Sequence, residues 1–208
     1  MPHQDNLKTF RVAVKKYLEF ISNGYLQNAQ GKTVFDKTFQ DFCVQASFLG
    51  IFVAWEAFLE TTFIDYTLGV PSITGQQMSK YVSPIDRAHS NRILIGSQKY
   101  VDWANSETVV RLANLYLKNG EPFNTNLKSI QSHITDLKTI RNACAHLSST
   151  TSTQLDSVAS RLLGTPISGV TVTALLTATD PNGQPGETIL DRYLSFLDAC
   201  AENLAKGE

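Results

Sequence analysis

The sequence predicts a mostly α-helical bundle, and three observations lead to this fold class. Long stretches repeat apolar residues at the three- and four-residue spacing of amphipathic helices. Residues suited to cap or end a helix stand at the borders of these stretches. The 208 residues contain no internal repeat and no linker long enough to require a second domain. We therefore expect residues 1–208 to form a single helical domain.

The first two helices are predicted over residues 4 to about 29 and 36 to about 68. The apolar stripe of the first comprises Leu7, Phe10, Val14, Tyr17, Leu18 and Ile21. Asp36 is suited to cap the second helix, and Gly69 is suited to end it. Residues 71–83, rich in Ser, Thr, Gln and Gly, are expected to form a loop.

The middle of the chain is expected to hold two further helices. Residues 86–103 are ambiguous, because residues 92–95 could form either a short strand or a helical turn, and both alternatives stay open. A helix capped at Asn105 or Ser106 is expected to reach about Lys118. A second one, capped at Asn124 or Thr125, is expected to continue to the stretch 140–146.

The C-terminal part mixes helical and β-branched patterns. The Ser/Thr-rich tract 147–153 is expected to interrupt the helix, and a short helix is expected at about 154–163. Residues 165–179 are rich in β-branched residues and are followed by turn signals, so the segment 165–186 is expected to be a small irregular or β-hairpin insert. The last helix is predicted over residues 187–205.

Bulk composition limits the classes of function. Apolar residues make up 42 % of the chain and charged residues 18 %, which argues against disorder. The 18 Lys and Arg residues nearly balance the 19 Asp and Glu residues, so the net charge is −1. Proteins that coat nucleic acids usually carry a basic excess, so any contact with RNA is expected to be local.

Cysteine usage and the apolar runs indicate a cytoplasmic protein. Cys43, Cys144 and Cys200 are far apart and form no CxxC pair, so free thiols in a reducing compartment are expected. The first residues have no basic segment leading into an apolar one, so no secretory signal is expected. The apolar run 42–55 is shorter than the roughly 20 residues of a membrane span and is expected to be a core helix.

One position departs from the apolar pattern of the helix predicted to begin near Thr125. The core-facing stripe of this helix comprises Leu127, Ile130, Ile134 and Leu137. Continued at the same spacing, the stripe reaches Arg141, so a permanent charge stands where another Leu or Ile is expected. A buried charge is costly unless it is paired and hydrogen-bonded, so Arg141 is expected to have a partner.

The second predicted helix offers that partner. Glu56 lies in its apolar stripe, which otherwise comprises Leu49, Phe52, Leu59 and Phe63. An ion pair of Glu56 with Arg141 would satisfy both charges, because arginine donates two parallel hydrogen bonds to a carboxylate. Glu60 is the alternative partner, and a purely structural salt bridge between two helices is the alternative role.

His146 follows Arg141 by five residues. On a straight helix this spacing corresponds to a rotation of about 140° and a rise of about 7.5 Å, so the two side chains would point in different directions. They can converge if the helix breaks near Ala145, or they can meet across a two-fold dimer axis. A lone histidine at this place can also serve as a C-terminal helix cap.

The stretch Arg141-Asn-Ala-Cys-Ala-His146 resembles the Arg-x4-6-His motif of the HEPN superfamily, in which a polar residue such as Asn142 commonly follows the arginine. The Trp55-Glu56 pair, in a long helix upstream, also resembles HEPN proteins found beside prokaryotic toxin and defence genes. The resemblance covers residues 4 to about 150 and the final helix. It implies a HEPN-like helical bundle in which the segment 165–186 has no counterpart.

The resemblance implies a metal-independent endoribonuclease that acts as a homodimer, with the two motifs facing a shared cleft. His146 is then the general base or acid, and Arg141 stabilises the charge that develops on the phosphate. Asn142 orients the histidine or a phosphate oxygen, and Glu56 holds Arg141. The implied product is a 2′,3′-cyclic phosphate, formed without a metal or cofactor. The implied partners are the RNA substrate and an antitoxin or regulatory protein.

Two other interpretations stay open beside a simple ribonuclease. One is a non-catalytic helical interaction or nucleotide-binding module, and the other is a toxin masked by a separate antitoxin. The sequence has no Cys/His cluster for a metal, no P-loop and no GxSxG elbow. Some family members carry a tyrosine two residues after the histidine, which a partner nucleotidyltransferase modifies. Ser148 takes that position here, so this mode of neutralisation is not expected.

Overall fold

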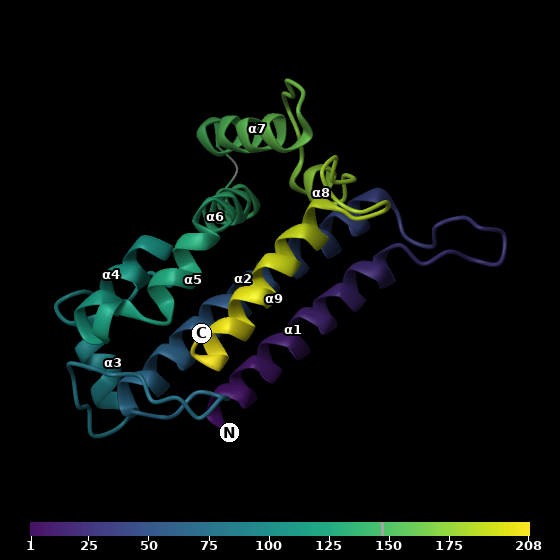
Figure 1. The fold of residues 1–208 in the computed structure, drawn as a ribbon. Helices are drawn as coiled ribbons and strands as arrows, with labels where there is room; N and C mark the ends of the chain where they lie inside the picture. Colours follow the sequence, from purple (N-terminus) through teal and green to yellow (C-terminus); the bar gives the residue numbers. More distant parts are fainter. Residues whose placement is uncertain (147) are drawn as a thin grey trace. The chain divides into compact units, whose positions relative to one another are not determined.

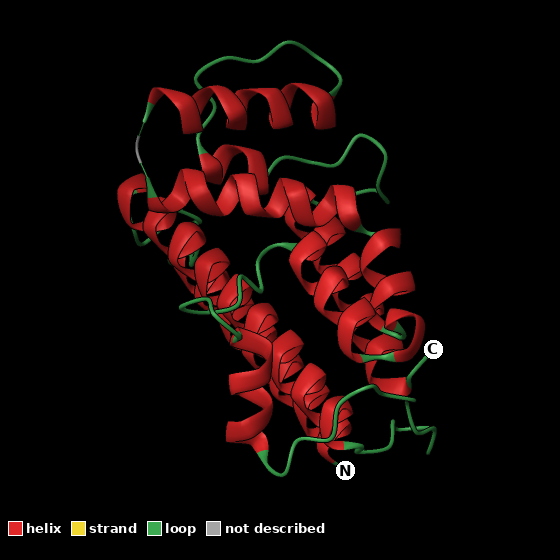
Figure 2. Ribbon diagram, turned by 90° about the vertical axis from the view of Figure 1, so that its left-hand side faces the viewer, coloured by secondary structure: helices red, strands yellow, loops and turns green. Residues whose placement is uncertain are grey.

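The predicted mostly α fold class is confirmed. The computed structural model describes residues 1–146 and 148–208, and within them it is 67 % helical with no strand (Figures 1 and 2). Single β-bridges, such as Gln27 with Thr33, occur only in connections. The arrangement is consistent with a helical bundle.

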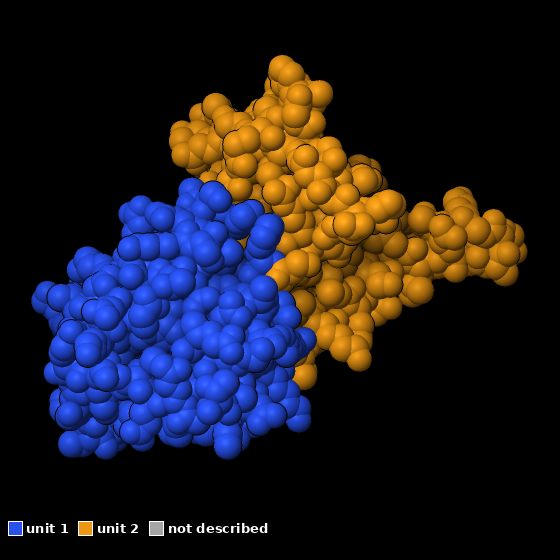
Figure 3. All heavy atoms as spheres, in the orientation of Figure 1, with its two compact units in different colours: residues 1–11, 55–135, 196–208 blue, residues 12–54, 136–195 orange. Residues whose placement is uncertain are grey.

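The chain divides into two compact units, coloured separately in Figure 3. Unit 1 comprises residues 1–11, 55–135 and 196–208, and unit 2 comprises residues 12–54 and 136–195. Four helices contribute residues to both units: α1 (Pro2–Gly24), α2 (Lys37–Leu68), α6 (Gln131–Ala145) and α9 (Ile189–Lys206). This division does not test the single domain expected from the sequence, which stays a prediction.

Aromatic side chains form much of the core of unit 1. The ring of Phe63 on α2 lies 5.7 Å from that of Trp103 and 4.8 Å from that of Phe123. Trp55 packs against Phe10 of α1 with ring centroids 5.9 Å apart. The remaining elements of this unit are α3 (Arg87–Ile95), α4 (Ser106–Tyr116), the 3-10 turn η1 (Lys118–Gly120) and α5 (Phe123–Ser129).

Unit 2 begins with a helical hairpin made by the second half of α1 and the first half of α2. Here the Tyr17 ring packs directly on Gly50, and a Cβ at Gly50 would lie 2.2 Å from it. Glycine at this position therefore allows the two helices to approach closely. The other elements of the unit are α7 (Ser149–Leu163), α8 (Val172–Leu176) and parts of α6 and α9.

Three predictions of local structure are wrong. The helix expected from residue 125 to the motif is broken at Ile130, which separates α5 from α6. The Ser/Thr tract does interrupt the helix, since α6 ends at Ala145, but the next helix, expected from about residue 154, already begins at Ser149, because Ser148 and Thr151 form a capping box. The strand expected around Val170–Thr173 is absent, since Thr171 caps the short helix α8. Leu147, the first residue of the tract, lies outside the described residues.

Other sequence expectations agree closely with the structure. Asp36 caps α2, since its Oδ1 accepts a hydrogen bond of 2.9 Å from Phe39 N, and Asn105 caps α4. The segment left open at 86–103 begins with a helix, α3, capped by Asp86. Helix caps can be predicted from the sequence because they depend on neighbours within one turn.

Helix α2 carries most of the apolar character of the chain. Among the described residues it is the one helix long and apolar enough to cross a membrane, judged by length and composition alone. The core helix of a protein without any membrane passes the same test, and 44 % of the most apolar window of α2 is buried within the chain. Cellular location therefore stays a prediction.

Candidate functional site

The predicted motif lies at the C-terminal end of α6, in unit 2. The helix ends at Ala145, and the backbone N–H of His146 donates the last helical hydrogen bond, 2.9 Å, to Asn142 O. The His146 side chain is exposed. The helix therefore ends near Ala145, which is one of the two ways in which Arg141 and His146 could converge, and the meeting of two motifs across a dimer axis stays a prediction.

Arg141 is half-buried instead of lying fully in the core stripe. The buried stripe of α6 continues through Ile140, which is 0 % exposed, so Arg141 lies at the border of the apolar face. Its Nη1 donates a hydrogen bond of 3.2 Å to Oδ1 of the neighbouring Asn142. The two polar side chains of the motif therefore contact each other, and Asn142 is oriented by Arg141.

The connection after α6 holds the backbone of His146 in place. Thr151 Oγ1, in the first turn of α7, donates a hydrogen bond of 2.7 Å to His146 O. The same Thr151 forms a capping box with Ser148, in which each side chain accepts a hydrogen bond from the other residue's backbone N–H, both at 3.2 Å. We did not predict this clamp, although the sequence signal, a Ser at 148 and a Thr three residues later, was present.

Cys144 stands between Arg141 and His146 and is half-buried. Burial raises the pKa of its thiol to about 12. A thiol with such a pKa is protonated at neutral pH, and the thiolate is the nucleophilic form of cysteine. Cys144 is therefore unsuited to act as a nucleophile.

Glu56 is half-buried on α2 and belongs to unit 1, whereas Arg141, Asn142 and His146 belong to unit 2. The ion pair expected between Glu56 and Arg141 would join residues of the two units. That pairing and the catalytic role of all four residues stay predictions.

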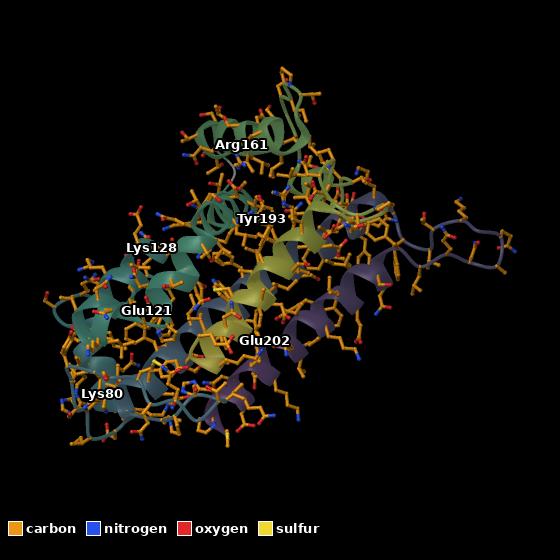
Figure 4. The ribbon with its side chains drawn as sticks, in the orientation of Figure 1. Lys80, Glu121, Lys128, Arg161, Tyr193 and Glu202 are labelled. Atoms are coloured by element: carbon orange, nitrogen blue, oxygen red, sulfur yellow. The ribbon has the colours of Figure 1, made fainter. Side chains whose placement is uncertain are left out.

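A second polar cluster in unit 2 was missed by the sequence reasoning. Asp136 on α6, which is 6 % exposed, accepts hydrogen bonds from Arg161 Nη2 on α7 and from the Tyr193 hydroxyl on α9, the latter at 2.9 Å. Figure 4 labels Arg161 and Tyr193 on these two helices. The cluster therefore ties three helices of the unit together. A pattern of apolar residues contains no signal for it.

The environment of this cluster shifts the pKa of two members. Burial raises the pKa of the Tyr193 hydroxyl, and the charge of Asp136 raises it further. The hydrogen bond to Asp136 raises the pKa of Arg161. Both shifts favour the protonated forms, so the cluster keeps one ion pair and one neutral hydroxyl at neutral pH. It suits a structural role.

The described part of the chain contains no group of three His, Cys, Asp or Glu side chains arranged to hold a metal ion. Comparisons of the chain with family models, curated proteins and solved structures found no match. The candidate site is therefore defined by its residues and their geometry alone.

Proposed function

We propose that this protein is a metal-independent endoribonuclease of the HEPN type, with His146 and Arg141 as its catalytic residues. The observation that carries the proposal is the position of His146. It is exposed directly after the end of α6, one turn beyond the contacting pair Arg141 and Asn142, and its backbone is held by Thr151. An exposed imidazole on a constrained backbone, close in sequence to a half-buried guanidinium, suits acid–base chemistry on a phosphodiester.

In the proposed reaction, a histidine removes the proton from the ribose 2′-OH. The 2′ oxygen then attacks the neighbouring phosphorus, and the bond from phosphorus to the 5′ oxygen breaks. A protonated group supplies a proton to that leaving oxygen, and the products are a 2′,3′-cyclic phosphate and a 5′-OH end. Arg141 stabilises the negative charge that develops on the phosphate, and Asn142 orients the histidine or a phosphate oxygen.

The proposed assembly is a homodimer in which two copies of the motif face one cleft. Two copies would supply two His146 side chains, so that one acts as base and the other as acid. We also propose a toxin–antitoxin or defence context in the cytoplasm, with an antitoxin or regulatory protein that masks the motif. Growth arrest on expression of the wild type that is relieved in His146→Ala would support this context.

The test is RNA cleavage by the pure protein in the presence of EDTA. His146→Ala is expected to lower the rate by about 10²–10⁴-fold, the usual contribution of a general acid or base. The matched control is His89→Ala, which removes a histidine of unit 1 outside the motif and is expected to keep activity. The product ends should be 2′,3′-cyclic phosphates. Full activity of His146→Ala, or dependence on a metal, would contradict the proposal.

An alternative is a non-catalytic helical interaction module, which the exposed apolar surface of unit 2 favours. This alternative predicts that pure protein cleaves no RNA and that His146→Ala changes no binding. Capture of a partner by the wild type that is unaffected by His146→Ala, together with absent cleavage, would select it.

A further inference from the structure

Unit 1 contains a small pocket where the first turns of α4 lie beside α5 and the start of α6. Its volume is about 190 Å³, and all of its lining residues belong to unit 1. Pockets for drug-sized ligands usually measure about 300–1,000 Å³. The size therefore suits a small ligand, or one end of a larger one. We call this cavity the α4–α5 pocket.

Two positively charged side chains line the α4–α5 pocket. Arg111 belongs to α4, and Lys128, labelled in Figure 4, belongs to the last turn of α5. Both residues are exposed, and within the described part of the chain neither side chain forms an ion pair or a hydrogen bond. Two cations in one cavity, neither of them paired with a carboxylate, attract an anionic ligand.

Among the residues that line the pocket, Glu107 carries the opposing charge. It stands four residues before Arg111, the spacing at which ion pairs form on a helix. Its Oε1 instead accepts a hydrogen bond of 3.2 Å from Nε2 of Gln131, which also lines the pocket. The lining thus carries two positive charges and one negative charge, and its net charge is +1.

Ser106, the first residue of α4, adds a hydrogen-bonding group to the lining. It is only 6 % exposed, and among the described residues its hydroxyl has no hydrogen-bond partner. Buried polar groups normally have a partner, so this hydroxyl points to a ligand in the pocket. The positive end of the helix dipole favours an anion at the same place. The cap Asn105 already accepts hydrogen bonds from the N–H groups of Glu107 and Thr108, so the hydroxyl, and not these amides, is free for a ligand.

Together these groups specify the chemistry of the ligand. Arg111 and Lys128 only donate hydrogen bonds, and the hydroxyl of Ser106 can donate a further one. A phosphate monoester suits this set, because it carries a charge of about −1.5 to −2 near neutral pH and presents three terminal oxygens. A carboxylate has one charge and two oxygens. Val110 and Leu127 complete the lining and provide apolar contacts for the carbon atoms beside the ester oxygen.

We propose that the α4–α5 pocket binds the phosphate group of a phosphate monoester. Arg111 binds its oxygens through parallel hydrogen bonds, and Lys128 binds them as a point charge. The hydroxyl of Ser106 donates to the remaining oxygen. The proposal does not rest on the ribonuclease function, because no residue of the Arg141–His146 motif lines this pocket.

The test is a titration of the ¹⁵N-labelled full chain with ribose 5-phosphate, followed by amide chemical shifts through the millimolar range. Saturable shifts are expected for the amides of residues 106–111 and 127–131, and ribose without phosphate is expected to cause none. Absence of these shifts with ribose 5-phosphate overturns the proposal.

Two variants place the ligand in the pocket. Arg111→Gln and Lys128→Gln are each expected to raise the dissociation constant about tenfold, the effect of losing a charge-assisted hydrogen bond. Both positions are exposed on helices and glutamine is a good helix former, so the fold should persist. The matched controls are Arg92→Gln and Lys8→Gln, which remove the same charges at exposed positions of unit 1 outside the pocket and should leave the dissociation constant unchanged.

A third variant has an effect of the opposite sign. Glu107→Gln removes the negative charge from the lining, so it is expected to tighten the binding of ribose 5-phosphate about threefold. A damaged fold would not tighten binding, so this variant keeps the test decisive if either of the other two fails to fold. Weaker binding in Glu107→Gln overturns the proposal.

Further probes identify the source of the phosphate. Equal affinity for ribose 5-phosphate and for a 5′-phosphorylated oligodeoxynucleotide supports a free small ligand, whereas tighter binding of the oligodeoxynucleotide supports the terminal phosphate of a nucleic acid chain. Tighter binding of dimethyl phosphate, a diester, overturns the assignment to a monoester. Equal dissociation constants in the pocket variants and the controls overturn the site. The proposed reaction cleaves none of these probes, so no result depends on whether His146 is catalytic.

Discussion

Two polar clusters of unit 2 differ in how completely their groups are satisfied. Asp136 is buried and accepts hydrogen bonds from two side chains on two other helices. Arg141 is half-buried and donates to the neutral amide of Asn142, while the His146 side chain, five residues further along the chain, is exposed. The first cluster joins helices that are distant in sequence, and the second lies within a few residues at one helix end.

This difference separates a structural role from a candidate functional one. A buried carboxylate whose hydrogen bonds are made by the protein has little left to offer a ligand, and removing it leaves a buried partner unsatisfied. An exposed imidazole has no such cost and remains available to a substrate. The comparison therefore predicts large stability effects at Asp136 and large activity effects at His146.

The largest stability effect is expected for Asp136→Ala, about 3 kcal/mol of unfolding free energy. This change leaves the buried hydroxyl of Tyr193 without its acceptor and removes the ion pair with Arg161. Arg141→Ala is expected to cost less than about 1 kcal/mol, because its hydrogen bond is to a neutral neighbour at a helix end. Urea unfolding followed by circular dichroism measures both.

The unfolding free energies of Asp136→Ala and Arg141→Ala can also contradict this comparison. A loss of about 3 kcal/mol or more in Arg141→Ala would mean that Arg141 belongs to a buried ion pair, as the expected partnership with Glu56 requires. Equal, small losses in both variants would mean that the Asp136 cluster contributes little to the fold.

A medium effect is expected for Tyr193→Phe, about 1–1.5 kcal/mol at neutral pH, because one hydrogen bond to a buried carboxylate is lost. The pKa of Tyr193 is raised in the folded protein. Its contribution is therefore complete below the unfolded tyrosine pKa of about 10 and declines as the pH rises above it toward the folded value. As the pH rises from about 9 to about 11, around the unfolded tyrosine pKa, the Tyr193→Phe variant should therefore lose less unfolding free energy than the wild type. Thermal unfolding at several pH values measures this difference. Parallel pH curves would contradict the assignment.

A smaller stability effect, about 1 kcal/mol, is expected for Thr151→Val, because it removes the capping box and the hydrogen bond to His146 O. If the clamp positions His146, cleavage should also slow about tenfold at unchanged KM, because a displaced catalytic group lowers the rate.

Thr151→Ser keeps the hydroxyl and should restore both the stability and the cleavage rate. The matched control is Thr153→Val, whose hydroxyl bonds only within α7. An unchanged cleavage rate in Thr151→Val would show that His146 is positioned without α7.

The regular helices could be predicted from the sequence because the residues that determine them are close together along the chain. The apolar spacing and the caps at Asp36 and Asn105 specified α2 and α4 closely, since both signals act within a turn or two. The exposed position of His146 after Ala145 also agrees with the expected helix break. The candidate motif itself was identified from spacing and resemblance.

Local patterns failed where distant contacts choose between alternatives. The β-branched run around Val172 became the buried helix α8, because burial in the core overrides β propensity in a short segment. The boundary between α5 and α6 at Ile130 was hidden by an apolar pattern that continues across it. In both places the spacing of apolar residues predicts which residues are buried, but it does not predict the secondary structure of the backbone.

The sequence alone determined three features: the mostly helical class, the main helix caps and the candidate residues Arg141, Asn142 and His146. Each of them depends on neighbours close along the chain. The partners of Asp136, the clamp of Thr151 on His146 and the α4–α5 pocket emerge only when α6, α7 and α9, or α4 and α5, pack against one another. Contacts between residues far apart in sequence cannot be predicted from the periodic spacing of apolar residues. Any of several polar pairs would fit the same pattern of buried and exposed positions. In the folded chain Ile140 takes the buried place at the end of the apolar stripe, and Arg141 lies at its border.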